Sequence, residues 1–122
     1  MKHRWPRKNR FIRMKRAHLG EFEELVLLAV ASLKEEAYGL EVQRVLREEA
    51  RRNVALATVH SALYRLEKKG YVRSALGGAT QQRGGRRKRL FTVTGGGLHT
   101  LTETRAVREH LWQQVHRLHP TA

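Results

Sequence analysis

Residues 56–72 read LATVHSALYRLEKKGYV, and this stretch decides the fold. Apolar side chains recur in it at helical spacing and would line one face of a helix. They are Leu56, Val59, Leu63 and Leu66, with Ala62 beside them. Gly70 then supplies a common helix stop. The stretch therefore predicts an amphipathic helix over residues 56–69, followed directly by an extended segment.

The opposite face of this predicted helix carries small polar, aromatic and basic side chains. They are Thr58, Ser61, Tyr64, Arg65 and Lys68. Side chains of these types contact base edges and phosphates when a helix lies in a DNA groove. The alternative is an ordinary solvated face, in which Arg65 pairs with Glu67 or with a neighbouring chain. His60 is ambiguous, since a neutral ring can pack beside Val59 and a ring facing DNA can donate to phosphate.

Two further helices are predicted on the N-terminal side. Over residues 21–36, the run from Leu25 to Ala31 is apolar on every face, so this helix needs cover on both sides. In a chain this small a second copy can supply that cover. Three glutamates at its start suit the positive end of a helix dipole. After Tyr38-Gly39, a helix over residues 40–50 presents Val42, Val45 and Leu46 on one face.

Two short strands are predicted on the C-terminal side, over residues 71–75 and 87–93. The segment 76–86 between them has four glycines and no apolar periodicity, as in a long hairpin loop. Arg87, Arg89, Phe91 and Val93 share one face by the period of two, so the second strand changes from charged to core-facing residues. The basic residues of this hairpin are expected to contact phosphates or enter a minor groove, unless they form a solvated loop. They are Arg83, Arg86, Arg87 and Lys88.

The last predicted helix begins after Thr94, a good N-cap residue. Gly95, Gly96 and Gly97 are poor helix formers, so a regular helix is expected only from near Leu98. Its apolar stripe consists of Leu98, Leu101, Leu111, Val115 and Leu118, interrupted by Arg105 and Arg108. Trp112 lies beside Leu111, where it either packs a dimer or stacks on a flat ligand.

The predicted order is helix, helix, helix, strand, strand, helix. This order is typical of a mainly α winged helix-turn-helix with a small β-hairpin, in which the third helix enters the major groove. We expect a disordered basic arm over residues 1–17, a DNA-binding domain over 18–97, and a dimerisation helix and tail over 98–122.

Charge is the extreme feature of the composition. Lys and Arg number 25 against 11 acids, all of them Glu, for a net charge of +14. Such a balance favours a polyanion as the partner. The first 16 residues hold eight bases and no acid, which predicts a disordered arm. Met14, at the end of this arm, offers a second translation start, and the sequence leaves both starts open.

Several classes of protein are disfavoured. The chain has no Cys, which excludes disulfides and thiolate metal sites. Its longest apolar run is seven residues, against the roughly 20 that a membrane helix needs, so we expect a cytoplasmic, nucleoid-associated protein without membrane contact. His110, His116 and His119 lack metal-ligand spacing, and no metal or cofactor is expected. No catalytic constellation or phosphate-binding loop is visible, so an enzyme is not expected.

In this order and spacing, four stretches resemble the PadR family of bacterial transcriptional regulators. They are LGEFEELVLLAV at 19–30, AYGLEV at 37–42, LATVHSALYRLEKKGYV at 56–72 and RGGRRKRLFTVTGGG at 83–97. The resemblance covers roughly His18 to Trp112. It implies a winged-helix DNA-binding domain and a homodimer held by the first helix and a single C-terminal helix. It also implies a repressor acting on double-stranded DNA, released in some members by a small-molecule effector.

Single positions carry the resemblance further. Tyr38 and Gly39 match the family's YG, Thr94 and Gly97 match its Thr-x-x-Gly, and His60 stands where members often have Tyr. Arg65-Leu66-Glu67 and Gly70 match its RLE…G ending. Two departures are Ala55, where a Ser often caps the recognition helix, and the Gly95–Gly96 pair, which is expected to loosen the joint to the last helix. The dimer contacts predicted on this basis are Leu25, Leu28, Leu101, Leu111, Trp112 and Val115, and Trp112 is the predicted contact for a planar effector.

A second hypothesis is a nonspecific nucleic-acid binder, acting on RNA or as an architectural DNA protein. The basic arm and the RGG tripeptide at 83–85 favour it, although a lone RGG is a weak signal.

Overall fold

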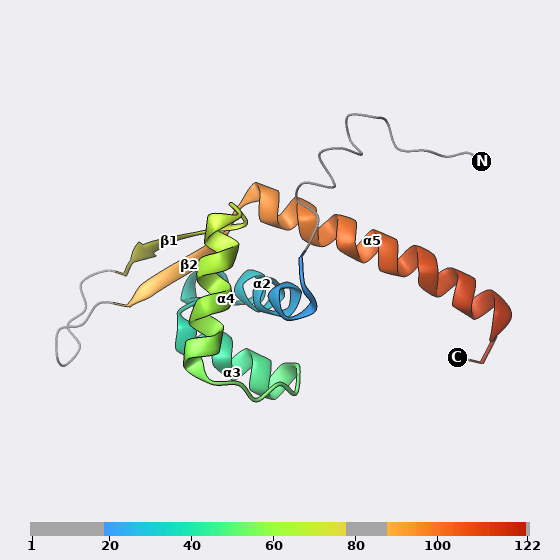
Figure 1. The fold of residues 1–122 in the computed structure, drawn as a ribbon, viewed down its shortest axis with the longest axis horizontal. Helices are drawn as coiled ribbons and strands as arrows, with labels where there is room; N and C mark the ends of the chain where they lie inside the picture. The colour runs from blue at the N-terminus through green and yellow to red at the C-terminus, as the bar shows by residue number, and fades with distance from the viewer. Residues whose placement is uncertain (1–18, 78–87, 122) are drawn as a thin grey trace.

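The computed structural model describes residues 19–77 and 88–121. The predicted arm and three of the predicted hairpin contacts, Arg83, Arg86 and Arg87, lie outside the described residues. Within them the elements follow one another as helices α2 (Glu21–Leu33), α3 (Gly39–Glu49) and α4 (Leu56–Lys68), strands β1 (Val72–Leu76) and β2 (Arg89–Val93), and helix α5 (Gly95–Leu118), with a 3₁₀ turn (Lys34–Glu36) after α2. This order confirms the expected mainly helical winged-helix fold (Figure 1).

Helix α2 forms the centre of the core. It packs against α3, α4, β2 and α5, and Figure 1 shows it enclosed between these elements. Val26, Leu27 and Val30 of α2 are almost completely buried. Each such side chain stabilises the fold by about 1.5–3 kcal/mol relative to leaving it in water. The apolar run of α2 therefore supplies, together with the buried face of α4, most of the core.

Helix α2 is shorter than the helix expected over residues 21–36. Lys34 adopts a left-handed φ of 52°, which a regular α-helix does not accommodate. Residues 34–36 continue instead as the 3₁₀ turn. The expectation of one continuous helix over residues 21–36 was therefore wrong for residues 34–36.

The hairpin is antiparallel and pairs Val72 with Val93 and Leu76 with Arg89. Along β2, Arg89 is exposed, Phe91 is buried and Val93 is half-buried, so the expected inward alternation is confirmed. The Phe91 N–H donates to the Ala37 carbonyl oxygen at 3.0 Å. An antiparallel bridge joins Tyr38 to Leu90. The base of the hairpin is therefore attached to the segment between α2 and α3.

Helix α5 is regular from Gly95, so the expectation that it begins near Leu98 was wrong. Thr94 Oγ1 accepts from the Gly97 N–H at 3.0 Å and donates to the Gly70 carbonyl oxygen at 2.7 Å. This cap satisfies an N–H that the helix start would otherwise leave unpaired, and it offsets the poor propensity of the three glycines. The N-cap role of Thr94 is confirmed. Figure 1 shows α5 running past the core, with its C-terminal half standing away from it.

Candidate nucleic-acid interface

The two faces of α4 differ as the sequence predicted. Val59, Ala62, Leu63 and Leu66 are fully buried. The five polar, aromatic and basic residues on the other side are all exposed, and we call them the outer face of α4: Thr58, Ser61, Tyr64, Arg65 and Lys68. Leu56 is only half-buried, since it lies in the first turn after the uncapped Ala55. The outer face is therefore free in this chain to contact a ligand.

His60 lies between the two faces and is half-buried. A Cβ built on Gly39 would lie 2.3 Å from His60 Nε2, so the imidazole packs against the first residue of α3. On its other side the ring stacks with Tyr64, with centroids 6.1 Å apart and planes at 27°. Tyr64 in turn lies 6.2 Å from the ring of Phe91. His60 thus supports Tyr64 and the start of α3, and its Nε2 is turned toward Gly39.

Arg65 has a partner that the sequence did not suggest. Its Nε donates to Glu23 Oε2 at 2.9 Å, and Lys69 Nζ donates to Glu23 Oε1 at 2.7 Å. The expected alternative partner Glu67 accepts instead from Ser74 Oγ at 2.8 Å. Glu23 is buried, with only 7% of its surface exposed. Arg65 therefore joins the end of α4 to α2, with about half of its side chain still exposed.

The charge on Glu23 follows from these contacts. Burial raises the pKa of its carboxyl, but the hydrogen bonds from Lys69 and Arg65 lower it by more, so the pKa lies below its usual value. The carboxylate is accordingly ionised at neutral pH and neutralises part of the positive charge at the end of α4. Within α2 Glu23 is the third helical residue of a capping box and accepts from the Gly20 N–H at 3.4 Å, but its two basic partners lie more than 40 residues away.

The base of the wing lies beside α4. Lys88, exposed at the start of β2, places Nζ 4.7 Å from the centroid of the Tyr38 ring. Arg89 Nη1 donates to Ser74 Oγ at 2.9 Å, and Ser74 donates to Glu67. This chain of hydrogen bonds runs from β2 across β1 to α4. It ties Arg89 to α4, while Lys88 lies over Tyr38, the residue before α3.

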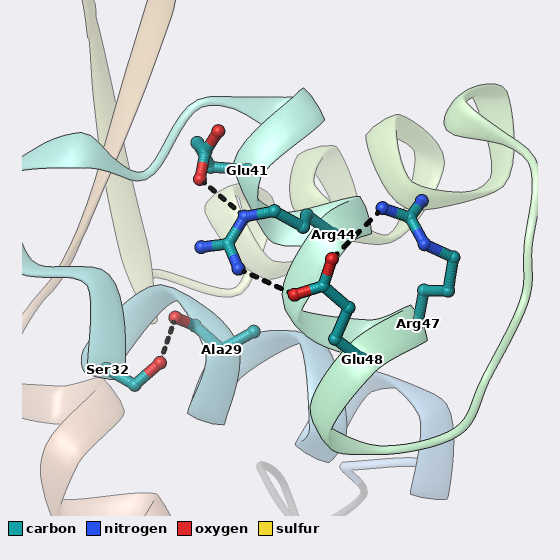
Figure 2. A network of polar contacts seen from close by, with 6 residues as sticks. All are labelled: Ala29, Ser32, Glu41, Arg44, Arg47 and Glu48. Carbon is teal, nitrogen blue, oxygen red and sulfur yellow. Dashed lines mark hydrogen bonds and ion pairs between the residues drawn. The ribbon is translucent and has the colours of Figure 1, made fainter.

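The exposed side of α3 is balanced in charge, unlike the outer face of α4. Figure 2 shows Arg44 between Glu41 and Glu48, with Nε–Oε1 and Nη1–Oε1 distances of 2.9 and 3.1 Å, and Arg47 on the other oxygen of Glu48. Hydrogen bonds to Glu41 and Glu48 raise the pKa of Arg44. Solvated pairs of this kind add little to stability. They do remove net charge, so α3 offers a polyanion little attraction on this side.

The predicted dimer contacts fall into two groups. Leu28, Leu111 and Trp112 expose 45%, 57% and 52% of their surface, and Leu25 and Val115 are half-buried. Leu101 differs, because it is 92% covered by the core of its own chain, with only 8% exposed. Trp112 stacks loosely with His116, with ring centroids 5.6 Å apart. An apolar surface therefore remains uncovered along α5 and on one side of α2.

Within residues 19–77 and 88–121, no three His, Cys or acidic side chains come together as metal ligands would. Nor does any helix there have the length and apolar character to cross a membrane.

Comparison with known proteins agrees with this geometry. Residues 27–103 match the Transcriptional regulator PadR-like family. No curated protein is similar enough to the chain to count as a match. A crystal structure of a PadR family transcription regulator from Clostridium difficile R20291 is 25% identical, with a TM-score of 0.60 over 80% of this chain and 96% of that one.

Two further structures are below 25% identity and show the fold. A PadR-like transcription factor from Bacteroides fragilis is 23% identical, with a TM-score of 0.67 over 90% of this chain and 98% of that one. A PadR family regulator from Eggerthella lenta DSM 2243 is also 23% identical, with a TM-score of 0.62 over 94% of each chain. With the family match across most of the winged helix, the chain belongs to the PadR-like family of DNA-binding transcriptional regulators.

Proposed function

We propose that this protein is a repressor that binds a palindromic operator as a homodimer. The observation that carries the proposal is the exposed outer face of α4, together with the exposed Lys88 and Arg89 of the hairpin. A helix in the major groove reads bases with small polar and aromatic side chains, while lysines and arginines beside it hold phosphates. We assign DNA binding to residues 18–97 and dimerisation to the helix and tail over 98–122, and place the protein at the nucleoid in the cytoplasm.

Within this proposal the contacts differ in role. Thr58, Ser61 and Tyr64 are exposed and lie in the first two turns and middle of α4, so we assign base contacts to them. Lys68 and Lys88 are assigned to phosphates, as are Arg83, Arg86 and Arg87 in the hairpin. Arg65 and His60 remain predicted DNA contacts. The contact of Arg65 with Glu23 and that of His60 with Gly39 favour a supporting role for both.

The proposed dimer joins two copies through α5 and the exposed side of α2. The exposure of Leu28, Leu111 and Trp112 supports their place in the proposed dimer interface, because a second copy of the chain would cover this apolar surface. Leu25 and Val115 are half-buried within their own chain, and we assign the exposed part of each side chain to the interface. Leu101 contributes little, because it is buried in its own core.

We also propose that a small planar molecule releases the repressor by stacking on Trp112. The exposed ring and its loose contact with His116 support this assignment. Titration of a Trp5→Phe protein with planar aromatic compounds tests it through the fluorescence of Trp112. Quenching that saturates is expected, with binding of the same compound, measured by calorimetry, lost in Trp112→Leu; fluorescence insensitive to every compound would refute the site.

Selection of bound duplexes from a random library tests the DNA-binding proposal. The full-length protein should enrich two inverted half-sites with centres about 10–10.5 bp, or a multiple of this, apart. Excess random duplex or RNA should compete poorly with the enriched sequence. Equal affinity for the selected duplexes, random duplex and RNA would instead establish the nonspecific nucleic-acid binder.

Two variants sharpen that experiment. Ser61→Ala should change the preferred base at one position of each half-site, at a cost of about 1–3 kcal/mol against the original sequence. Arg117→Gln removes a charge near the end of α5, far from α4 along the chain, and should leave the sequence preference unchanged. An unaltered preference in both variants would reject Ser61 as a base contact.

A further inference from the structure

One ion pair joins the projecting helix α5 to the first turn of α2. Arg108 Nη2 donates to Glu24 Oε1 at 2.8 Å, across 84 positions of sequence. The Glu24 side chain is 15% exposed and that of Arg108 is 57% exposed. Leu101, seven residues earlier, is the last side chain of α5 that the described part of the chain buries completely enough to belong to its core. The pair thus ties α5 to α2 beyond the point where apolar packing ends.

The three glutamates in the first turn of α2 pair with bases in three different parts of the chain. Glu21 pairs with Arg52, before α4, and Glu23 pairs with Arg65 and Lys69 of α4. Glu24 alone among these three has its partner on α5. Its contact therefore sets the position of α5 relative to α2, whereas the other two set that of α4 and the segment before it.

The start of α5 is held against the residue that precedes β1. A Cβ on Gly97 would come 2.3 Å from the Tyr71 carbonyl oxygen, so the helix is pressed against the backbone there. A Cβ on Gly95 would meet nothing within 4 Å, and one on Gly96 would make only ordinary contacts, the nearest at 3.7 Å. The helix is therefore fixed at Thr94, Gly97 and Leu101, and its direction farther along depends on contacts beyond Leu101.

We propose that the Glu24–Arg108 pair fixes the angle at which α5 leaves the DNA-binding domain, and so determines the spacing between half-sites. This inference rests on the proposed dimer. Beyond Leu101, residues 101–118 of α5 span roughly 25 Å of helix. A tilt of about 8° in this segment moves its far end by about 3.5 Å, close to the 3.4 Å rise of one base step. Glu24 and Arg108 are thus positioning residues, which touch no DNA and select which operators both copies can reach.

The size of the effect is set by the exposure of the pair. A partly solvated ion pair biases an equilibrium by at most about fivefold. Loss of the pair should therefore broaden the distribution of spacings without abolishing binding. The half-site sequence should not change, because α4 keeps its own contacts with Glu23.

Selection from a duplex library with full-length proteins tests the inference, with the half-sites and their spacing read separately. In Arg108→Gln, the half-site should match that of the wild type, while the share of sequences at the preferred spacing falls by up to about fivefold. Arg105→Gln is the matched control, since it removes the same charge one turn earlier on α5 and should keep the wild-type spacing. Glu24→Arg combined with Arg108→Glu restores an ion pair and should restore most of the preference.

The outcomes are separable. A wild-type spacing distribution in Arg108→Gln, with paired half-sites present, would overturn the inference and leave the proposed function standing. Equal broadening in Arg105→Gln would also overturn it, because the effect would then follow net charge. Single half-sites or no enrichment with the wild-type protein would overturn the proposed function, and the inference with it.

Discussion

The ring of His60 occupies the space that a side chain at position 39 would need, with Nε2 2.3 Å from the Cβ that Gly39 lacks. The ring fits against the first residue of α3 because that residue carries no side chain. His60 also stacks on Tyr64, so this contact holds an aromatic residue of the outer face.

Replacement of Gly39 by Ala should destabilise the protein through this contact. Forcing the ring aside costs about 1–3 kcal/mol, the usual cost of an overpacked site. In a His60→Ala background the same replacement should be neutral or slightly stabilising, because Ala favours helix more than Gly does. Urea unfolding of the two single variants, the double variant and the wild type measures this coupling. An equal cost of Gly39→Ala in both backgrounds would locate the clash elsewhere.

Acid should weaken the contact between α2 and α4 through Glu23. Its pKa is lowered in the folded protein, so its ionised form stabilises the fold above the ordinary value of 4.5. That stability is lost as the pH falls from about 4.5 through the lowered pKa. With two hydrogen bonds from partly exposed cations, the contribution should be about 1–2 kcal/mol. In Glu23→Gln the free energy of unfolding at neutral pH should be lower, and it should fall less between pH 5 and pH 3. Urea unfolding at each pH measures both. If the variant loses as much stability in acid as the wild type, other carboxylates cause the acid sensitivity.

The three glycines at the start of α5 should respond differently to alanine. Gly95→Ala has open space and should stabilise the protein by about 0.4–1 kcal/mol, by reducing the freedom of the unfolded chain. Gly97→Ala should destabilise it, since the Tyr71 carbonyl oxygen stands 2.3 Å from the new Cβ. Thermal unfolding of the two variants should thus shift the midpoint in opposite directions. A rise in both would mean that α5 shifts away from β1 at little cost.

Removal of Lys88 should weaken binding to all DNA sequences about equally. If its ammonium neutralises one phosphate, Lys88→Ala should reduce the slope of log affinity against log salt by about 1. Arg117→Gln removes the same charge near the end of α5 and should leave the slope unchanged. Binding titrations at several salt concentrations, on an enriched operator and on random duplex, measure both quantities. A loss confined to the operator would reassign Lys88 to base recognition.

The sequence predicted the fold well where its signals were periodic. The buried stripe of α4, the cap at Thr94 and the inward alternation of β2 all depend on neighbouring residues, so a local pattern was sufficient for each. The start of α5 was mispredicted for the opposite reason. Low helix propensity at Gly95 and Gly96 is local, but Thr94 is fixed by the distant Gly70 carbonyl oxygen, and this tertiary contact outweighs propensity.

The candidate site was less predictable than the fold. Exposure of Thr58, Ser61 and Tyr64 followed from helical periodicity alone. The ion pair between Arg65 and Glu23 did not follow from periodicity. The first turn of α2 has three glutamates, and the helix dipole accounts for all of them equally well. Only the packing of α4 on α2 selects Glu23. The fit of His60 against Gly39 likewise depends on how α3 and α4 cross, which no spacing reveals.

The first turn of α2 also bears on how the chain is made. Its acids pair with bases at residues 52, 65, 69 and 108, all later in the chain, so this turn acquires its partners one after another as synthesis proceeds. Contacts over such separations form late and slow folding. On the ribosome, α2 and the wing can assemble before α5 has emerged, but Glu24 stays unmatched until Arg108 leaves the exit tunnel. The projecting helix is therefore fixed against α2 only after residue 108 has been synthesised.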